Sequence, residues 1–495
     1  MKYYFNIIIS LISLVSYIQV EAQSNALTFD QLITEGFENN YDIKLRKLSL
    51  NKADYSLLKA RGGLNASINT DLTYGAGVNP SFDNDGTQIL QTRFIVPTKL
   101  GLDFYSGFRV ERTIQFGSTN TPFNASGAFV GLKMPLLSGL GKASPLNTDI
   151  EVSKINREAS EKEFSNEILT YFSKILQNYL TLKQVVQEYN ISKDIVDESK
   201  KYREQIFTLV ESDQIPSSEK SRANSLYIGN LQKLTIAKMQ ASQVYYGTKI
   251  LLGVDERKHD SIPTLLDLFP EPTSDKILAF IYSKKNNLDS LIKSTPQYKS
   301  IALDVNASEI LLNNAENQKK NPLDLDVRVS SFGSYENGVF NLNRTFNSTP
   351  GTSLLVTLSH VFPIRNQQRK GAYLEKVTEY DISKTNLKQY LFENSVNANL
   401  NLNLLRQKIE MYDEAKLLVD LMKENYEDEL EKFKLGNSTQ TDIIITLDNY
   451  FDALKSLNSL KYDVWKTYIN IKFILGELPK NETELNRFLF SSLFY

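Results

Sequence analysis

The feature that most constrains the fold is a pair of amphipathic helical stretches that are too long for a compact domain. The first spans about residues 143–210 and the second about residues 365–432. An α-helix rises 1.5 Å per residue, so each would be roughly 100 Å long. Each is followed by a tight turn and a shorter helix running back, over 217–252 and 443–475. The sequence therefore predicts long antiparallel helical hairpins.

The second return helix shows the packing pattern most clearly. Its apolar residues step alternately by four and three positions, as in a coiled-coil seam, with one break at Lys461. In the preceding turn, Gly436 suits a left-handed helix end. Ser438 or Thr439 can cap the next helix, with Asp442 in its first turn. The seam comprises Ile443, Leu447, Tyr450, Leu454, Leu457, Lys461, Val464, Tyr468, Ile471 and Leu475.

Between the helices the apolar period changes from 3.6 to 2, which predicts β-strands. The four clearest strands are joined by loops rich in Gly, Asn, Asp and Pro, and the short run 92–96 is a candidate additional strand. Five stretches alternate, and four of them are counted as clear strands: 64–74, 100–114, 128–134, 323–330 and 354–358.

The two halves of the chain repeat one order of elements, namely helix, strands, long helix, turn and short helix. Pro135 aligns with Pro363, Asp213 with Gly436, and Leu252–Gly253 with Leu475–Gly476. The first helix is expected over 27–61, with a break near 39–42. Its length and that of the return helix together match the length of the long helix. This match predicts a rod roughly 100 Å long, with strands at one end and turns at the other. The expected organisation is 1–22, a signal peptide; 23–253, a first repeat; 254–274, a linker or equatorial segment; 275–476, a second repeat; and 477–495, a C-terminal equatorial segment.

Composition bounds the class of protein. A net charge of −2 gives no broad basic surface for nucleic acid, and the absence of cysteine excludes disulfides, thiolate metal sites and a lipidated N-terminal cysteine. Lys2, the apolar run 3–20 and the small residue Ala22 predict a secretory signal peptide; the alternative is an uncleaved anchor. No further apolar stretch is long enough for a membrane helix, so a mature membrane-spanning chain would have to form a closed β-barrel.

Four strands cannot close a barrel, whereas three copies would contribute about twelve. The expected fold class is therefore mainly α with a membrane β-barrel: helical hairpins forming an α-helical barrel, and strands contributing to a trimeric, twelve-stranded β-barrel. The chain resembles the TolC-like outer membrane efflux protein family over nearly its whole mature length. The motifs that carry the resemblance are Leu27–Leu32, Pro135–Gly141, Phe433–Asp442 and Ile474–Gly476.

The resemblance implies a homotrimeric channel-tunnel in the outer membrane of a Gram-negative bacterium, with a periplasmic helical extension. Such a channel exports small molecules in a tripartite efflux system, together with a periplasmic adaptor and an inner-membrane pump of the RND, ABC or MFS type. The alternatives are the exit duct of a type I protein secretion system and a coiled-coil envelope protein without a pore. No catalytic constellation is visible, His259 and His360 are isolated, and no enzyme activity, metal or cofactor is expected.

The resemblance also places the periplasmic entrance at the two helix turns. By position, Glu219 and Asp442 match acidic residues that ring the entrance, and Phe433 and Ser438 stand where the family has a tyrosine and an arginine that help to close it. An ordinary role in helix capping is the alternative for Asp442 and Glu219. The exposed tips are the expected adaptor contacts: Asp213, Pro216, Gly436, Asn437 and Thr439.

Overall fold

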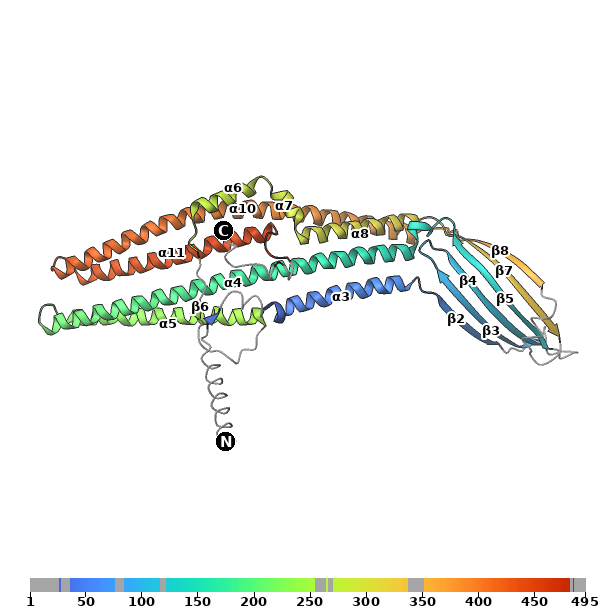
Figure 1. Cartoon of the computed structure of the whole chain (residues 1–495), viewed down its shortest axis with the longest axis horizontal. Coiled ribbons are helices and arrows are strands. Elements are labelled where there is room, and N and C mark those ends of the chain that lie inside the picture. The colour runs from blue at the N-terminus through green and yellow to red at the C-terminus, as the bar shows by residue number, and fades with distance from the viewer. Residues whose placement is uncertain are drawn as a thin grey trace, which may run out of the picture. The chain divides into compact units, whose positions relative to one another are not determined.

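A computed structural model describes residues 26–27, 36–75, 84–115, 122–253, 264–265, 270–336, 351–480 and 484 (Figure 1). They form two compact units, and each unit takes segments from both halves of the chain. The helix unit contains residues 1–47, 163–298 and 390–495, and the strand unit contains 48–162 and 299–389.

The elements alternate as the sequence predicts. The helices are α3 (Tyr41–Gly62), α4 (Pro145–Glu211), α5 (Ser218–Leu252), α6 (Ser274–Lys285), α7 (Leu288–Ser294), α8 (Pro296–Gln318), α10 (Gln367–Lys434) and α11 (Gln440–Ile474), with a 3₁₀ turn at Gly141–Ala143. The strands are β1 (Ala26–Leu27), β2 (Ser67–Gly75), β3 (Asn84–Pro97), β4 (Asp103–Gln115), β5 (Pro122–Pro135), β6 (Thr264–Leu265), β7 (Leu323–Glu336) and β8 (Gly351–His360).

The two long hairpins repeat each other closely. The long helices α4 and α10 have 67 and 68 residues, and the return helices α5 and α11 have 35 each. Both return helices are followed by a left-handed glycine, Gly253 at φ 67° and Gly476 at φ 66°. The predicted hairpins and the pairing of these two glycines are confirmed.

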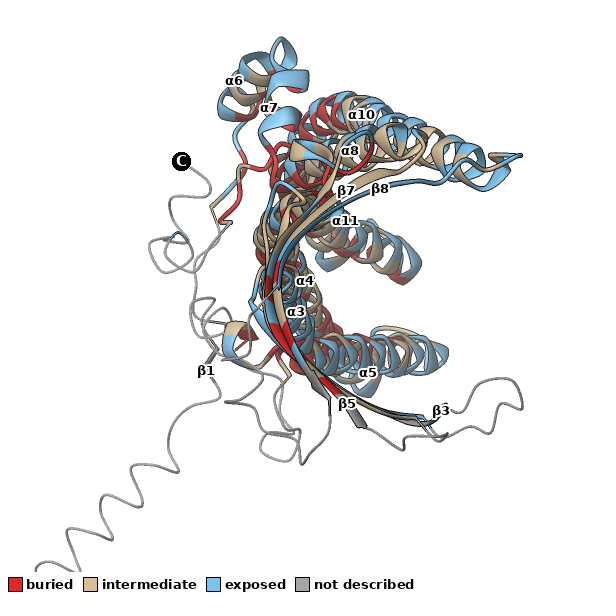
Figure 2. Ribbon diagram, turned by 90° about the vertical axis from the view of Figure 1, so that its right-hand side faces the viewer, coloured by how far each residue is buried: buried red, intermediate tan, exposed pale blue. Residues whose placement is uncertain are grey.

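The core of the helix unit lies where α4 and α11 pack with α10 and the short helices α6 and α7 (Figure 2). Its largest fully buried side chains come from one stretch of α4 and include Phe172, Leu176 and Tyr179. From α11 the core takes Val464, Ile469 and Ile471. Within residues 168–182 of α4 the buried side chains are apolar except for Ser173, whereas Lys174 is exposed, as expected for a helix with one buried face.

The start of the first helix differs from the prediction. Leu27 lies in the short strand β1, whose residues pair in parallel with β6, rather than in a helix. A helical turn over 36–39 ends at Asn40, whose Oδ1 accepts a hydrogen bond from the Ile43 backbone N–H at 3.1 Å, and α3 then begins. The predicted break near 39–42 is confirmed, because the asparagine side chain caps the new helix. Thr28, which the sequence suggests as the N-cap of this first helix, lies outside the described residues.

The sequence also predicts a helix over about 275–319 with a break near Pro296, and the structure divides this stretch twice. The break at Pro296 is confirmed, since this proline opens α8, where its missing N–H costs nothing. A second break at Asn286–Asn287 separates α6 from α7. Neither asparagine makes a side-chain cap.

The strand unit contains one antiparallel sheet of six strands in the order β2-β3-β4-β5-β7-β8. The sequence predicts four clear strands, with the run 92–96 only as a candidate. That run is in fact the end of the 14-residue strand β3. Three copies of a six-strand sheet amount to three times six, or eighteen strands, so the expected number of twelve does not follow from this structure.

The register divides the sheet into two faces of opposite character. We call one face apolar, and among the strand residues whose side chains are described it carries one charged side chain, Arg112. The members of this apolar face include Leu72, Leu90, Phe94, Phe104, Val130, Val327, Leu354, Val356 and Leu358. The face called polar carries Asp71, Arg93, Asp103, Arg109, Glu111, Lys133, Asp324, Asp326 and Arg328. The predicted alternation of apolar and polar positions is therefore present in the sheet, except that β3 also places Ile89 and Ile95 on the polar face.

No helix in the described part of the chain is long and apolar enough to cross a bilayer. The predicted signal peptide, most of the 254–274 linker and the C-terminal residues after 484 lie outside the described residues.

Candidate functional site

The first helix turn, between α4 and α5, is closed by Asp213 in a left-handed conformation at φ 55°. The Asp213 N–H donates to the Val210 carbonyl at 3.1 Å, and the Gln214 N–H donates to the Leu209 carbonyl at 3.0 Å. This pair of bonds is a Schellman motif. Asp213 is exposed at the tip, and Pro216 is exposed on the same turn.

The second turn, between α10 and α11, repeats the same backbone. Gly436, at φ 75°, donates its N–H to the Phe433 carbonyl at 2.9 Å, and Asn437 donates to the Lys432 carbonyl at 2.9 Å. The alignment of Asp213 with Gly436 is thus confirmed at the level of individual hydrogen bonds. Gly436, Asn437 and Thr439 are exposed.

Asp442 and Thr439 form a capping box at the start of α11. The Asp442 N–H donates to Thr439 Oγ1 at 3.3 Å, and the Thr439 N–H donates to Asp442 Oδ2 at 3.2 Å. The hydroxyl of Thr439 also donates to Asp442 Oδ2, at 2.6 Å. These hydrogen bonds from Thr439 hold the pKa of Asp442 below its usual value. Of the two predicted caps, Thr439 is the one used.

Ser438 has a different partner. Its hydroxyl donates to the carboxylate of Glu429 in α10, and Glu429 also pairs with Lys432 at 3.1 Å. The bond from Ser438 and then the bond from Lys432 lower the pKa of Glu429. Ser438 therefore ties the turn to the end of α10.

The two hairpins meet just behind the turns in a small buried cluster. Tyr202 and Ile206 of α4, Ala223 of α5 and Ile443 of α11 are all buried there. Phe433 packs against this cluster, with its ring centroid 6.4 Å from that of Tyr202. Burial raises the pKa of Tyr202. The aromatic side chain at position 433 thus holds the turn of the second hairpin against the first hairpin.

Glu219 lies at the polar edge of this contact. Its side chain is 18% exposed and pairs with Arg222 at 3.4 Å, and its backbone carbonyl accepts from Gln440 Nε2 at 3.4 Å. Its Oε2 and the Oε1 of Gln440 are buried without a hydrogen-bond partner among the described residues. The structure therefore brings Glu219, Phe433 and the start of α11 together, whereas Asp442 faces solvent.

Sequence reasoning missed a second polar contact, around Glu271. Its carboxylate accepts hydrogen bonds from Lys461 of α11 and Tyr412 of α10. Next to it, Trp465 Nε1 donates to the Pro270 carbonyl at 3.1 Å. Burial acts to raise the pKa of Glu271, but the bonds from Lys461 and Tyr412 outweigh it and leave this pKa below its usual value. The lysine that interrupts the apolar seam of α11 was the available signal for this contact.

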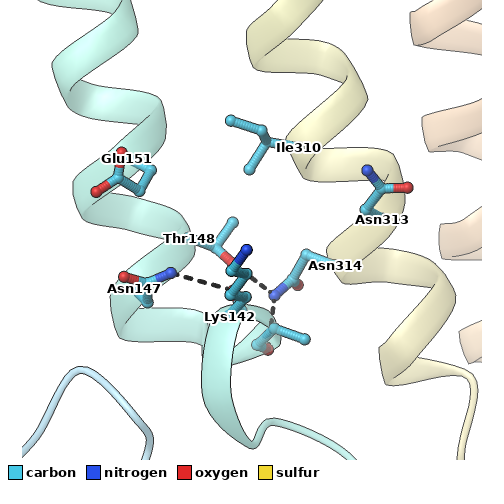
Figure 3. A pocket seen from close by; sticks show the side chains of 8 residues that line it. Lys142, Asn147, Thr148, Glu151, Ile310, Asn313 and Asn314 are labelled. Carbon is cyan, nitrogen blue, oxygen red and sulfur yellow. Dashed lines mark hydrogen bonds between the residues drawn. The ribbon is translucent and has the colours of Figure 1, made fainter.

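A cavity of about 570 Å³ opens between α4 and α8 within the strand unit (Figure 3). Asn314 Nδ2 donates across it to the Ala143 carbonyl at 3.0 Å and to Thr148 Oγ1 at 2.8 Å. Lys142, Asn147 and Glu151 line the same cavity. Asn314 uses both amide hydrogens to join α8 to α4. Its side chain at this cavity therefore holds the two helices together.

The described residues contain no cluster of three or more side chains suited to a metal ion. His360 lies at the end of β8 beside Phe362, with ring centroids 6.3 Å apart. The two packed hairpins thus present two exposed turns that carry charged side chains.

The fold is that of solved bacterial outer membrane channels. The outer membrane channel CmeC of Campylobacter jejuni superposes with a TM-score of 0.65 at 15% identity, covering 94% of this chain and 90% of that chain. The outer membrane protein VceC of Vibrio cholerae gives a TM-score of 0.65 at 11% identity, covering 90% and 96%. The open state of the MtrE channel of Neisseria gonorrhoeae gives 0.58 at 13% identity, covering 90% and 88%. The fold implied by the sequence resemblance is confirmed.

Comparison of the sequence with protein-family models and with curated proteins finds no match.

Proposed function

We propose that this chain is the outer membrane channel-tunnel of an efflux system. It forms a homotrimer in the outer membrane of a Gram-negative bacterium, after export directed by its N-terminal signal peptide. Small molecules pass through it from a periplasmic adaptor and an inner-membrane pump of the RND, ABC or MFS type to the exterior. The observation that carries the proposal is the two-faced sheet, because a coiled-coil protein without a pore has no use for it.

The sheet fits a membrane wall. Its apolar face is solvent-exposed in the single chain, with Leu72, Leu354 and Leu358 each more than 60% exposed. An exposed apolar surface of this extent requires another apolar phase to cover it, and lipid provides one. The polar face would then line water.

The edges of the sheet support assembly with further copies. All nine residues of β2 and all ten residues of β8 are exposed, and each of these strands has one unpaired edge. Unpaired edges are a liability that closure removes. Because the sheet has an even number of antiparallel strands, β2 and β8 run in opposite directions, so β8 of one copy can pair antiparallel with β2 of the next.

The helix unit also carries unpartnered apolar stripes. One lies on α5 of the first hairpin and the other on α10 of the second hairpin. Since the two stripes are different surfaces, pairing one with the other is heterologous, and a threefold rotation between copies would close such contacts into a ring. The stripes are Ile228, Ile236, Met239, Tyr246 and Ile250 on α5, and Val396, Leu400, Leu404, Met411, Leu418 and Leu421 on α10, all exposed.

The helix turns are the proposed periplasmic entrance. Three copies of exposed Asp442 would form an acidic ring that attracts cations, and Glu219 would add to it from the neighbouring turn. Phe433 and Ser438 hold the entrance in shape, through Tyr202 and Glu429 respectively. Asp213, Pro216, Gly436, Asn437 and Thr439 form the surface offered to the adaptor.

Purified trimer in a planar bilayer tests the proposal. It should conduct, with a preference for cations that falls in Asp442→Ala and falls further when Glu219→Ala is added. Thr446→Ala, one turn deeper in α11, is the matched control. Conduction with unchanged cation preference in the double variant would refute the acidic ring but not the channel. If the protein does not conduct and imaging shows no threefold hollow particle, the proposal of a channel is refuted. Cross-linking from Asn437 that captures no adaptor would refute the docking role.

A further inference from the structure

The number of strands in the sheet determines how wide the outlet of the channel is. This inference rests on the trimeric channel proposed above. Each chain contributes six paired strands to one sheet. The register is continuous from β2 to β8 apart from one irregularity at Asn84–Gly86. A threefold assembly joined at the edges would therefore close eighteen strands rather than twelve.

Strand number fixes the bore of a barrel. With neighbouring strands about 4.8 Å apart and a tilt of about 40°, eighteen strands give a backbone diameter of roughly 36 Å, and twelve give roughly 24 Å. Allowing about 5 Å of side chain on each side leaves a clear width of roughly 26 Å or roughly 14 Å respectively. Barrels of sixteen to eighteen strands belong to the range that leaves an open aqueous lumen.

The side chains of the polar face lie low against the sheet. Three aromatic residues pair across strands with glycine: Tyr105 with Gly131, Phe129 with Gly107, and Phe332 with Gly127. A Cβ atom on Gly131 would stand 2.3 Å from Tyr105 Cζ, and one on Gly107 would stand 2.8 Å from Phe129 Cζ. The rings thus lie over the glycines, an arrangement that supports curved sheets.

The polar face is also the inner face of the curve. The sheet bends visibly in Figure 2. Phe129 on the polar face is 5% exposed, whereas the next residue, Val130 on the apolar face, is 58% exposed. Side chains crowd on the concave side of a curved sheet and splay on the convex side, so the polar residues face inward.

The inner face selects neither charge. Its four cationic residues and five anionic residues are interspersed over the sheet, and several are already paired. Arg109 bonds Glu111 at 2.7 Å, and Tyr105 donates to Asp326. Such a lining is hydrated and nearly neutral in sum.

We propose that the strand end of the assembled channel is an eighteen-stranded outlet, hydrophilic and wide enough for cargo as large as a small folded polypeptide. The outlet itself therefore does not select its cargo by charge. This deepens the proposed function by naming the size class of cargo that the outlet admits.

Exclusion of neutral polymers from the conducting trimer tests the proposal. Poly(ethylene glycol) fractions are added to the side that the strand end faces. Fractions of hydrodynamic radius up to about 10 Å should enter and lower the conductance, whereas a twelve-stranded outlet would exclude those above about 7 Å.

Two neighbouring positions on β8 provide a matched pair of variants. Thr357 lies on the polar face and Val356 on the apolar face, and both are exposed. Thr357→Trp should lower the cut-off radius from the strand side, and Val356→Trp should leave it unchanged. A conducting trimer with a cut-off radius of about 7 Å, or a barrel of twelve strands on imaging, would refute the eighteen-stranded outlet but not the proposed channel. A protein that does not conduct and shows no hollow particle would overturn both.

Discussion

At the scale of single residues, the two helix turns solve one backbone problem with different amino acids. Both require a left-handed residue, supplied by Asp213 in the first turn and Gly436 in the second. A left-handed conformation costs an L-residue about 1 kcal/mol, so glycine at this position stabilises the turn by that amount. The greater freedom of glycine in the unfolded chain offsets about half of this stabilisation. The first turn is thus held less tightly than the second, through this one residue.

Exchanging these residues should change how readily each turn opens. Asp213→Gly should slow amide exchange at Gln214 about twofold, and Gly436→Asp should speed exchange at Asn437 about twofold. These two amides are suitable reporters because each donates the closing bond of its turn, to Leu209 and Lys432. Faster exchange at Gln214 in Asp213→Gly would show that the aspartate side chain itself stabilises the turn.

The capping box gives the start of α11 a pH dependence. Hydrogen bonds from Thr439 depress the folded-state pKa of Asp442, so their contribution to stability is present above the unfolded pKa of about 4 and is lost as pH falls through the folded value. Protection of the Asp442 and Ile443 amides should be constant from neutral pH to about pH 5 and should decline below about pH 4. Asp442→Asn should flatten this dependence. A protection profile that is unaffected by Asp442→Asn would refute the role of the carboxylate.

Local sequence was enough to place the turns, because left-handed and capping residues act within a few positions. It could not show that Tyr202, Phe433 and Gln440 meet, since that contact joins segments far apart in the chain. Gln440 in particular has no sequence signal, being a polar residue that only the packing of the two hairpins buries.

At the scale of elements, the segment before α6 is fastened to the hairpin by Glu271. The carboxylate binds Lys461 and Tyr412, and the adjacent Pro270 carbonyl accepts from Trp465. Because Trp465 is the sole tryptophan of the sequence, its fluorescence reports on this attachment. The break in the α11 seam at Lys461 is therefore a site of attachment rather than a flaw in packing.

Loss of this attachment should be visible in tryptophan emission. Glu271→Ala should shift the emission of Trp465 to the red, because the segment over the indole is released to water. In the wild type the same shift should appear as pH falls, since the folded-state pKa of Glu271 is depressed and its contribution is lost on protonation. Ser274→Ala, which removes only the nearby bond to Asp413, is the control and should leave emission unchanged. Unchanged emission in Glu271→Ala would mean that apolar packing alone holds the segment.

The helices were easier to predict than the strands, for a physical reason. An amphipathic helix of 67 residues repeats its pattern many times, whereas a strand offers only a few alternations. In β3 the pairs Ile89–Leu90 and Ile95–Val96 put apolar side chains on both faces, which obscured the period of two. The register across the sheet, which assigns each residue to a face, comes only from pairing with β2 and β4.

At the scale of the whole molecule, assembly should depend on two different surfaces of each chain. If the apolar stripe on α5 packs against the stripe on α10 of the next copy, either Met239→Lys or Leu404→Lys should prevent closure of the ring. Burying an unpaired lysine ammonium costs several kcal/mol, which exceeds what one lost methionine or leucine contributes. Native mass measurement in detergent should then give smaller species in place of the trimer.

Mixing the two variants distinguishes a head-to-tail ring from a symmetric dimer interface. A chain with an altered α5 stripe retains an intact α10 stripe, and a chain with an altered α10 stripe retains an intact α5 stripe. One productive contact can therefore form between them, and a mixed pair should appear that cannot grow into a ring, because both of its outer surfaces carry lysine. Gln240→Lys is the control and should leave the trimer intact, because this exposed polar residue of α5 is turned about 100° around the helix from Met239. A trimer that persists in both single variants would show that the strand edges β2 and β8 alone carry the assembly.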